Sequence, residues 1–515
     1  MPMQYPDRLI PLARSANVAP FFGDLHNHCG ISYGHGSVED ALRNATLQLD
    51  FVSITGHAYW PDMPVDDPTV AHIVAFHVEG FARLERLWPG HFEQLAAVHK
   101  PGGFTVFPGY EMHSNAHGDY TIVLQDLRQR GMIKADTPEG LRRELAAAYG
   151  TAAIAFPHHI AYRTGARGIN WETFDPALSP VVELISMHGC SESSTTDRPF
   201  LHSMGPGDGP NTIHAGWNAG HVFGVIGGTD HHSGFPGSHG HGRAVVYARE
   251  NTSDSLWEAI RARHTGALTG DNCHLFARLG EAIPGDYVDP TSHAVLQVEA
   301  LGGGAIDYID VLRNGHVVHR VTPQITPAPL HRDAARLESI IMLELGWGAR
   351  GTQHVWKGSL AVEAGSIDAV EPRLRGPEVV SPLEAAGEVP PGGTVRLEDG
   401  EIRFDICAQA NPNNQTQATQ ALAARVRLYP DAEVHLRTGE IDIRVSADRL
   451  LSGAKTGNLG GIDTPAFRLH QLPRPEEWQW TGKIALDPLE RGDWVALRMR
   501  QRNGQYCWSS PFFCR

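Results

Sequence analysis

Two pairs of candidate metal ligands lie far apart in the sequence and give the clearest chemical signal in the chain. His26 and His28 close the segment Asp24-Leu-His-Asn-His28, while Asp230 and His232 follow the apolar run from 221 to 226. Residues two apart in a β-strand point to the same face, so each pair would present two ligand atoms together. Imidazole is a common ligand of divalent metal ions. One such pair alone could equally be a polar strand end, but the two together predict a metal site.

Other polar residues follow further predicted strands. The apolar stretches 51–55, 104–107, 152–156, 181–186 and 221–226 predict strands that end near His57, Glu111, His158, His188 and Asp230. The segments between them predict helices over 37–49, 70–99 with a break at Pro89-Gly90, 137–149 and 253–264. Strands that alternate with helices favour a parallel sheet, and we expect a barrel. Its active site would gather at the carboxyl ends of the strands.

Composition narrows the classes of partner. The 515 residues carry a net charge of −15, which argues against nucleic acid and anionic membranes, because both require a basic surface. No apolar run approaches the roughly 20 residues that span a bilayer, and the first residues lack the apolar core of a signal peptide. Six scattered cysteines suggest no secretory disulfide framework. We therefore expect a cytoplasmic protein that acts on a small molecule, and a homo-oligomer is compatible with the sequence.

The second half of the chain has a different pattern. Most of the 29 histidines precede residue 275, whereas beyond it short alternating stretches are joined by Asn-Gly and Asp-Gly pairs that favour hairpin turns. We predict a hydrolase-type α/β domain over 1–275 and a β-rich, sandwich-like region over 276–515. The Pro/Gly-rich stretch 371–393 would be a linker or a long surface connection.

The ordered motifs of the first half resemble the polymerase-and-histidinol-phosphatase (PHP) family of metal-dependent hydrolases. They are Gly23-Asp-Leu-His-Asn-His28, Ile54-Thr-Gly-His57, Gly109-Tyr-Glu111, Phe156-Pro-His158, Met187-His-Gly189 and Thr229-Asp-His-His232. The run from Ser179 to Glu192 and the segment Trp508-Ser-Ser-Pro511 are similar to a larger, poorly characterised branch with a β-rich C-terminal extension. The resemblance implies a distorted (β/α)7 barrel followed by that extension.

The resemblance also implies up to three divalent metal ions, with zinc, manganese and iron as candidates. One ion would be held by His26, His28, Glu111 and Asp230; a second by His158 and His188 with Glu111 as a bridge; and a third by His35, His57 and His232. A glutamate at a buried strand end is costly unless it is paired, which favours this interpretation independently. His159 competes with its neighbour His158, because only one of two adjacent residues on a strand easily points inward.

Such a centre implies attack by a metal-bridging hydroxide on a phosphate ester, without a covalent enzyme intermediate. Arg163 and Arg167 are candidates to bind the oxyanion, although both could be solvated surface residues, and Arg243 is a weaker candidate. His117 could act as a general acid, or could be structural like His113, His239 and His241. The candidate catalytic residues are therefore Arg163, Arg167, His117 and His159. Cys29 and Cys190 lack an evident base partner, so we do not expect a nucleophilic cysteine.

Two other functions fit the same residues. The metal ions could instead serve a lactone, amide or carboxyl-ester hydrolase, since metal-activated water attacks acyl and phosphoryl centres alike. The amidohydrolase barrel also begins with a His-x-His pair, but the Asp-x-His ending and the mid-chain glutamate favour the PHP pattern. A non-catalytic binding module, with the β-rich half recognising a partner, is the alternative from a different class.

Overall fold

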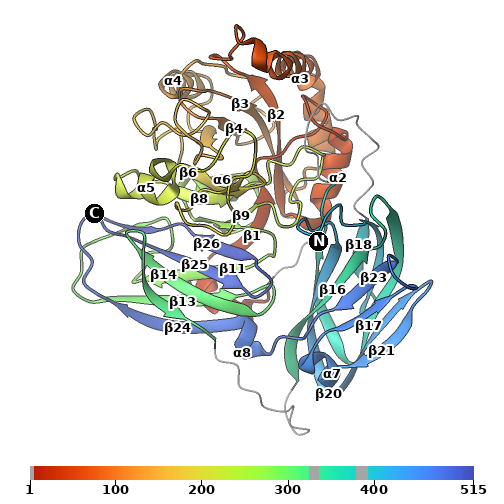
Figure 1. Cartoon of the computed structure of the whole chain (residues 1–515). Coiled ribbons are helices and arrows are strands. Elements are labelled where there is room, and N and C mark those ends of the chain that lie inside the picture. Colours follow the sequence, from red (N-terminus) through yellow and green to blue (C-terminus); the bar gives the residue numbers. More distant parts are fainter. Residues whose placement is uncertain (1–4, 324–335, 378–392) are drawn as a thin grey trace.

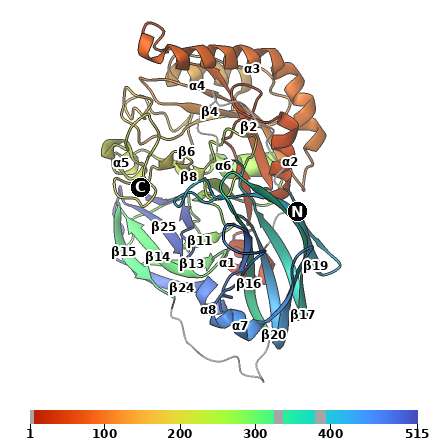
Figure 2. The same cartoon turned by 45° about the vertical axis from the view of Figure 1, so that its right-hand side comes forward.

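The computed structural model describes residues 5–323, 336–377 and 393–515. An α/β body built mainly from the first half of the chain lies above two β-rich bodies (Figures 1 and 2). The mixed α/β character of the first half and the predominance of strands in the second agree with the sequence-based prediction. No helix among these residues is both long enough and apolar enough to cross a membrane.

The largest sheet contains strands from both halves of the chain. Its main order is β12-β27-β25-β26-β10-β9-β1-β2-β3-β4-β5, and β14 and β15 continue from β25. The strands of the first half are β1 (Ala19–Asp24), β2 (Phe51–Tyr59), β3 (Thr105–Met112), β4 (Tyr120–Leu124), β5 (Ala153–Pro157), β9 (Arg243–Ala248) and β10 (Thr265–Leu268). Those of the second half are β12 (Tyr287–Val288), β14 (Ile306–Arg313), β15 (His316–Val321), β25 (Trp494–Gln501), β26 (Tyr506–Ser509) and β27 (Phe512–Cys514).

The expected (β/α)7 barrel is wrong as a closed structure. β1, β2, β3 and β5 run in one direction, but β4, between β3 and β5, is antiparallel to both. β6 (Val181–Ser186), β7 (Gly189–Cys190) and β8 (Gly224–Gly227) form a separate sheet. In the described parts of the chain, no ladder joins β5 to β6. Isolated hydrogen bonds replace it, from Ala155 N–H to Leu178 O and from Ser179 Oγ to Ala155 O.

Helices pack beside the strands of the α/β body. They are α2 (Val38–Gln48), α3 (Ala71–Val98), α4 (Pro138–Tyr149), α5 (Ile213–Asn218) and α6 (Ser253–Arg261), with single 3₁₀ turns at Asp7–Leu9, Pro68–Val70 and Gly209–Asn211. The short helix α1 (Pro11–Ser15) instead contacts strands of the second half of the chain. Ser37 caps α2, and its Oγ accepts a hydrogen bond from Asp40 N–H at 3.0 Å in a reciprocal capping box. This is the cap that the sequence predicts.

The predicted break at Pro89-Gly90 is wrong, because α3 continues through both residues. A proline inside a helix removes one backbone hydrogen bond. Here the tertiary contacts on either side outweigh that cost: Trp88 and Phe92 are buried, and Trp88 Nε1 donates to Arg130 O at 2.6 Å.

The second half forms two β-rich bodies. One contains a three-stranded sheet of β11 (His274–Leu279), β13 (Ala294–Leu301) and β24 (Gln479–Leu486), preceded by the short helix α8 (Pro475–Trp478). The other is an eight-stranded sheet with helix α7 (Ala447–Ser452), packed around its own apolar core. Its strands are β16 (Leu337–Trp347), β17 (Gln353–Arg373), β18 (Thr394–Glu398), β19 (Glu401–Gln409), β20 (Gln420–Thr438), β21 (Asp442–Ser446), β22 (Lys455–Asn458) and β23 (Pro465–Leu469). The sandwich-like arrangement of this region stays a prediction.

Two of the predicted hairpin turns have the expected backbone. Asn314 and Gly315 between β14 and β15, and Asp399 and Gly400 between β18 and β19, all have positive φ, as primed turns require. Of the stretch 371–393, the first residues complete β17 and run on to Pro377, and residues 378–392 lie outside the described residues.

The proposed division at residues 275/276 stays a prediction, but the largest sheet crosses it. β26 pairs with β10 in antiparallel register, with Ala267 opposite Trp508. Trp508 is 4% exposed and belongs to the same apolar cluster as residues of α2, α3 and β2. The end of the chain therefore completes the α/β body that carries the candidate site.

This pairing predicts a stability effect of Trp508→Ala. Loss of a buried tryptophan costs about 3–5 kcal/mol of unfolding free energy, measured by urea denaturation followed by circular dichroism. Ile462→Ala is the control, because Ile462 is 94% exposed and its truncation should change stability by less than about 0.5 kcal/mol. A loss of less than about 1 kcal/mol for Trp508→Ala would contradict the structural role of β26.

Candidate metal centre

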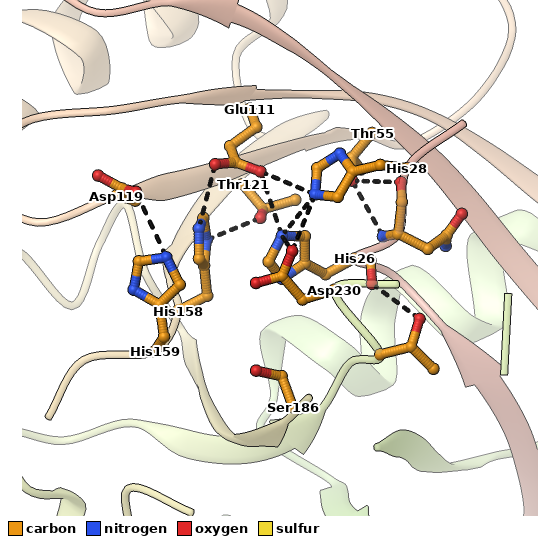
Figure 3. A network of polar contacts seen from close by, with 12 residues as sticks. His26, His28, Thr55, Glu111, Asp119, Thr121, His158, His159, Ser186 and Asp230 are labelled. Carbon is orange, nitrogen blue, oxygen red and sulfur yellow. Dashed lines mark hydrogen bonds and ion pairs between the residues drawn. The ribbon is translucent and has the colours of Figure 1, made fainter. Parts of the chain in front are cut away.

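Two buried carboxylates, Glu111 and Asp230, form the centre of the candidate site (Figure 3). His28 Nε2 lies 3.1 Å from both Glu111 Oε2 and Asp230 Oδ1. His26 Nε2 lies 3.2 Å from Glu111 Oε2 and 3.5 Å from Asp230 Oδ1. The two pairs that are distant in sequence thus meet around one glutamate, as their positions at strand ends predict.

Backbone hydrogen bonds hold these pairs next to each other. The segment after β1 and the segment after β8 form a parallel bridge at Asn27 and His231. Asp230 N–H donates to His26 O at 2.8 Å, and His28 N–H donates to His231 O at 2.9 Å. Asp230 itself has a φ of +52°, a left-handed conformation that a non-glycine residue adopts at a cost and that is often found at functional sites. The turn places its carboxylate between His28 and His188.

Three more histidines surround the two carboxylates, each from a different strand end. His158 Nε2 lies 3.3 Å from Glu111 Oε1, and His188 Nε2 lies 3.0 Å from Asp230 Oδ2. His57, opposite Glu111 in the β2–β3 ladder, places Nε2 at 3.7 Å from Glu111 Oε2.

Several sets of three residues bring ligand atoms within 4.8 Å of one another. These sets are His26, His28 and Glu111; His28, His57 and His232; His57, Glu111 and His113; Asp119, His158 and His159; and His159, His188 and Asp230. Eight of the nine predicted ligands belong to at least one set. The exception is His35, whose backbone N–H bonds to His232 O while its buried Nε2 has no hydrogen-bond partner among the described residues.

The ring nitrogens that face away from the centre have their own partners. These contacts are His26 Nδ1 with Glu183 Oε2 (2.7 Å), His57 Nδ1 with Ser32 Oγ (3.1 Å), His158 Nδ1 with Thr121 Oγ1 (3.0 Å) and His188 Nδ1 with Tyr162 Oη (2.8 Å). Metal-binding histidines characteristically donate their second ring N–H to such groups, which fixes the ring and leaves the other nitrogen free for the metal. The four rings are therefore held as the rings of metal-binding histidines are.

The electrostatics of the centre also fit bound cations. Burial would raise the pKa of Glu111, but the imidazoles of His158 and His57 hold it well below its usual value. Burial lowers the pKa of His158 to about 3, helped by His26, so this ring is neutral near pH 7. Its Nε2 is buried and makes no hydrogen bond, although Glu111 Oε1 is 3.3 Å away. When His158 donates its Nδ1 proton to Thr121 Oγ1, Nε2 presents a lone pair to the Glu111 carboxylate, and a cation between them would satisfy both groups. The donor set suits zinc, manganese or iron.

One group beside the centre was not predicted as part of it. Asp119 is fully buried and accepts hydrogen bonds from Arg167, including Nε at 2.7 Å. His113 Nδ1 lies 3.0 Å from Asp119 Oδ2 and 3.1 Å from Glu111 Oε1. The spacing Glu111-x-His113 repeats that of His26-x-His28, and this was the available signal. No comparable spacing marks Asp119, whose partner Arg167 follows much later in the chain.

The adjacent residues His158 and His159 both reach the centre, so the expectation that only one could point inward is wrong. His159 has a φ of +33°, which interrupts the strand alternation directly after β5. Its Nε2 lies 3.4 Å from Asp119 Oδ2.

The other candidate catalytic residues lie in different surroundings. Arg167 is paired with Asp119 and lies near His113. His117 Nδ1 contacts Thr173 Oγ1 at 3.1 Å, and His117 lines a small cavity with His113. Arg163 is exposed, and within the described ranges its side chain makes no hydrogen bond or ion pair. The catalytic roles of all four candidates stay predictions.

Three further residues from the sequence analysis have structural surroundings. Arg243 is buried and donates to Gly237 O, at 2.9 Å from Nε, and to Asn272 Oδ1. It therefore anchors the loop that follows Asp230 and His232. Burial raises the pKa of both the Cys29 and the Cys190 thiol to about 12. Both thiols are neutral near pH 7, which agrees with the absence of a nucleophilic cysteine from the predicted mechanism.

Comparisons with known proteins give distant similarities. No protein-family model matches the chain. An uncharacterized protein of Chlamydia pneumoniae is 26% identical over 172 residues, which is 30% of this chain but only 28% of that relative's length. A solved two-domain protein of Bacteroides vulgatus containing a predicted PHP-like metal-dependent phosphoesterase is 13% identical, with a TM-score of 0.31 over 84% of this chain and 96% of the other.

Two other solved structures are similar over about half of the chain. PsfC of Pseudomonas syringae is 15% identical, with a TM-score of 0.30 over 48% of this chain and 91% of the other. A lesion-specific endonuclease of Pyrococcus furiosus is also 15% identical, with a TM-score of 0.29 over 47% of this chain and 56% of the other. The name of the Bacteroides vulgatus structure contains the family that the sequence motifs resemble.

The contact between His26 and Glu183 predicts an effect on metal affinity. Glu183→Gln removes the charge that orients and polarises His26, so zinc affinity should fall by about 10–100-fold, measured by competition with a fluorescent chelator. Glu172→Gln, at an exposed position, is the control and should leave affinity unchanged. Equal affinities in the two variants would contradict the supporting role of Glu183.

Zinc affinity should also depend on pH through His26. Burial would lower the pKa of His26, but Asp230 and Glu183 raise it well above its usual value, so the metal-free site holds a proton there at neutral pH. Despite burial, the pKa of His28 is raised as well, by Asp230 and Glu111. Metal binding displaces such protons, and affinity should therefore rise by at least about tenfold per unit between about pH 6 and pH 8. The same competition assay across this range gives the slope, and an affinity independent of pH would contradict the assignment.

Proposed function

We propose that the protein is a metal-dependent hydrolase of phosphate esters, with up to three divalent ions (zinc, manganese or iron) held by the sets around Glu111 and Asp230. The observation that carries this proposal is the convergence of imidazole Nε2 atoms on these two buried carboxylates, from strand ends that are distant in sequence. The phosphate-ester class rests on the resemblance of the ordered motifs to the PHP family.

Different groups of residues would bind the different metal ions. When bound, the metal ions would supply activated water and would neutralise charge that develops during ester hydrolysis. His26, His28, Glu111 and Asp230 would bind one ion, His158 and His188 would extend the site, and His57 and His232 would complete it. His35 remains a weaker candidate because it belongs to none of the sets.

The group beside the centre supports the binding of an anionic substrate. Arg167 places a guanidinium group near His113 and Asp119, and its planar fork suits a phosphate oxygen. Asp119 would hold this arginine in place through their ion pair. The net charge of −15 favours a small-molecule substrate over nucleic acid, and we propose a cytoplasmic enzyme.

A substrate panel tests the proposed function. The full-length protein, supplied with manganese or zinc, should hydrolyse at least one phosphomonoester or phosphodiester in a panel that also contains lactones, amides and carboxyl esters. Glu111→Gln and Asp230→Asn should each reduce kcat by at least about a hundredfold, because each removes the negative charge of a proposed metal ligand. Glu79→Gln, on the outer face of α3, is the control and should retain activity.

Three results would count against this proposal. Activity only on lactones, amides or carboxyl esters would mean that the substrate is an acyl compound and not a phosphate ester. Full activity of Glu111→Gln would contradict the site. The proposal of an enzyme would be contradicted if protein purified without chelator contained no stoichiometric metal and hydrolysed no compound of the panel.

A further inference from the structure

A second cavity lies between the two β-rich bodies, apart from the candidate metal centre. It has a volume of about 490 Å³ and is lined by strands β16 and β23, the loop containing His239, and residues near 303 and 502. Small-molecule sites typically measure about 300–1,000 Å³. None of the lining residues belongs to a set that could hold a metal ion. Figures 1 and 2 show the two bodies side by side.

The acidic residues that line this cavity already have partners. Glu344 accepts hydrogen bonds on both oxygens, from Thr419 Oγ1 at 2.7 Å and from His470 Nε2 at 2.8 Å. Glu477 is paired with Arg502 at 3.3 Å and accepts from Arg474 N–H at 2.8 Å. These carboxylates are therefore not free to neutralise other cations of the lining.

Arg375 is a largely buried cation of the cavity wall that hydrogen-bonds only to neutral groups. It donates to Thr419 O at 2.6 Å, Gln417 Oε1 at 3.0 Å and His239 Nδ1 at 3.1 Å. His239 can accept at Nδ1 because its Nε2 donates to Asp271 Oδ1 at 2.8 Å. Among the described residues, no carboxylate lies within 4 Å of the guanidinium nitrogens. A guanidinium group stays charged even when buried. Glu344 and Asp271 act on this charge only from a distance, so none of the described carboxylates pairs with it directly.

Arg468 adds a second guanidinium group to the same wall. It lies on β23 opposite Glu344 of β16, and its side chain is exposed. In the part of the chain that the structure describes, it makes no ion pair, since the carboxylate of Glu344 is occupied by Thr419 and His470. Two arginines without carboxylate partners thus line one cavity.

We propose that this cavity is a second ligand site that binds a small molecule through a phosphate or carboxylate group. Arg375 and Arg468 would bind the oxyanion, because the planar arginine fork matches both groups. Ile340, Met342 and Leu472 also line the cavity and would cover an apolar part of the ligand. The bound anion would neutralise a buried positive charge that is otherwise costly. This site does not depend on the proposed hydrolase activity.

Calorimetric titration with inorganic phosphate and, separately, with succinate tests the proposal. The full chain is used with Asp230→Asn, which disables the candidate metal centre, so that the binding heat reports on other sites. At least one anion should bind, and adding Arg375→Gln or Arg468→Gln should weaken binding by about tenfold or more, as expected for the loss of a charge-assisted hydrogen bond. Arg86→Gln, an exposed arginine of α3, is the matched control and should bind as before.

The titrations distinguish the two classes of anion from each other and from a cavity that binds neither. Binding of phosphate alone assigns a phosphate ligand, and binding of succinate alone assigns a carboxylate ligand. If neither anion binds, or if Arg468→Gln leaves the Kd within about twofold, the proposal is overturned. Arg468 is exposed, so its replacement should not affect folding and decides the question even if Arg375→Gln fails to fold. Because no activity is measured, the result does not depend on whether the metal centre is catalytic.

Discussion

The structure of the site depends on one electrostatic constraint, which is that two buried carboxylates share a small space with several imidazoles. Glu111 and Asp230 are 2% and 3% exposed. Burying such charges is favourable only when cations or hydrogen-bond donors surround them. Despite burial, the pKa values of His26 and His28 are raised by the neighbouring carboxylates, whereas burial lowers the pKa of His158 and His232 to about 3. Divalent ions would satisfy the remaining lone pairs and carboxylate oxygens together.

Hydrogen bonds around the ends of β1 and β8 keep the two carboxylates and the imidazoles together. Asp24, at the end of β1, accepts hydrogen bonds from Thr229 Oγ1 at 2.5 Å and from Gly237 N–H at 2.8 Å. The buried Asp24 carboxylate thereby fixes both Thr229, which precedes Asp230, and the loop that follows His232. Arg243 reinforces the same loop through Gly237 O. Strand β26, near the end of the chain, extends the same sheet, because it pairs with β10, which in turn pairs with β9.

The sequence predicts much of the site because strand ends mark it locally. His26, His57, Glu111, His158 and His188 each follow a recognisable apolar stretch. Features set by distant contacts could not be predicted in this way: the pairing of Asp119 with Arg167, the support of His26 by Glu183, and the pairing of β26 with β10 join segments far apart in the chain. The closed barrel was not found because the largest sheet ends at β5, while β6 pairs with β7 and β8 in a separate sheet. Within the largest sheet, β4 runs antiparallel to β3 and β5. Hydrophobic patterns encode neither the direction nor the partner of a strand.

The most direct test of the metal centre is an anomalous difference map from a crystal of the full chain soaked with zinc. We expect a strong peak enclosed by His26, His28, Glu111 and Asp230, with Glu111 shared by any second peak near His158. A map with no anomalous density among these residues, at a zinc concentration that gives peaks elsewhere on the protein, would contradict this expectation.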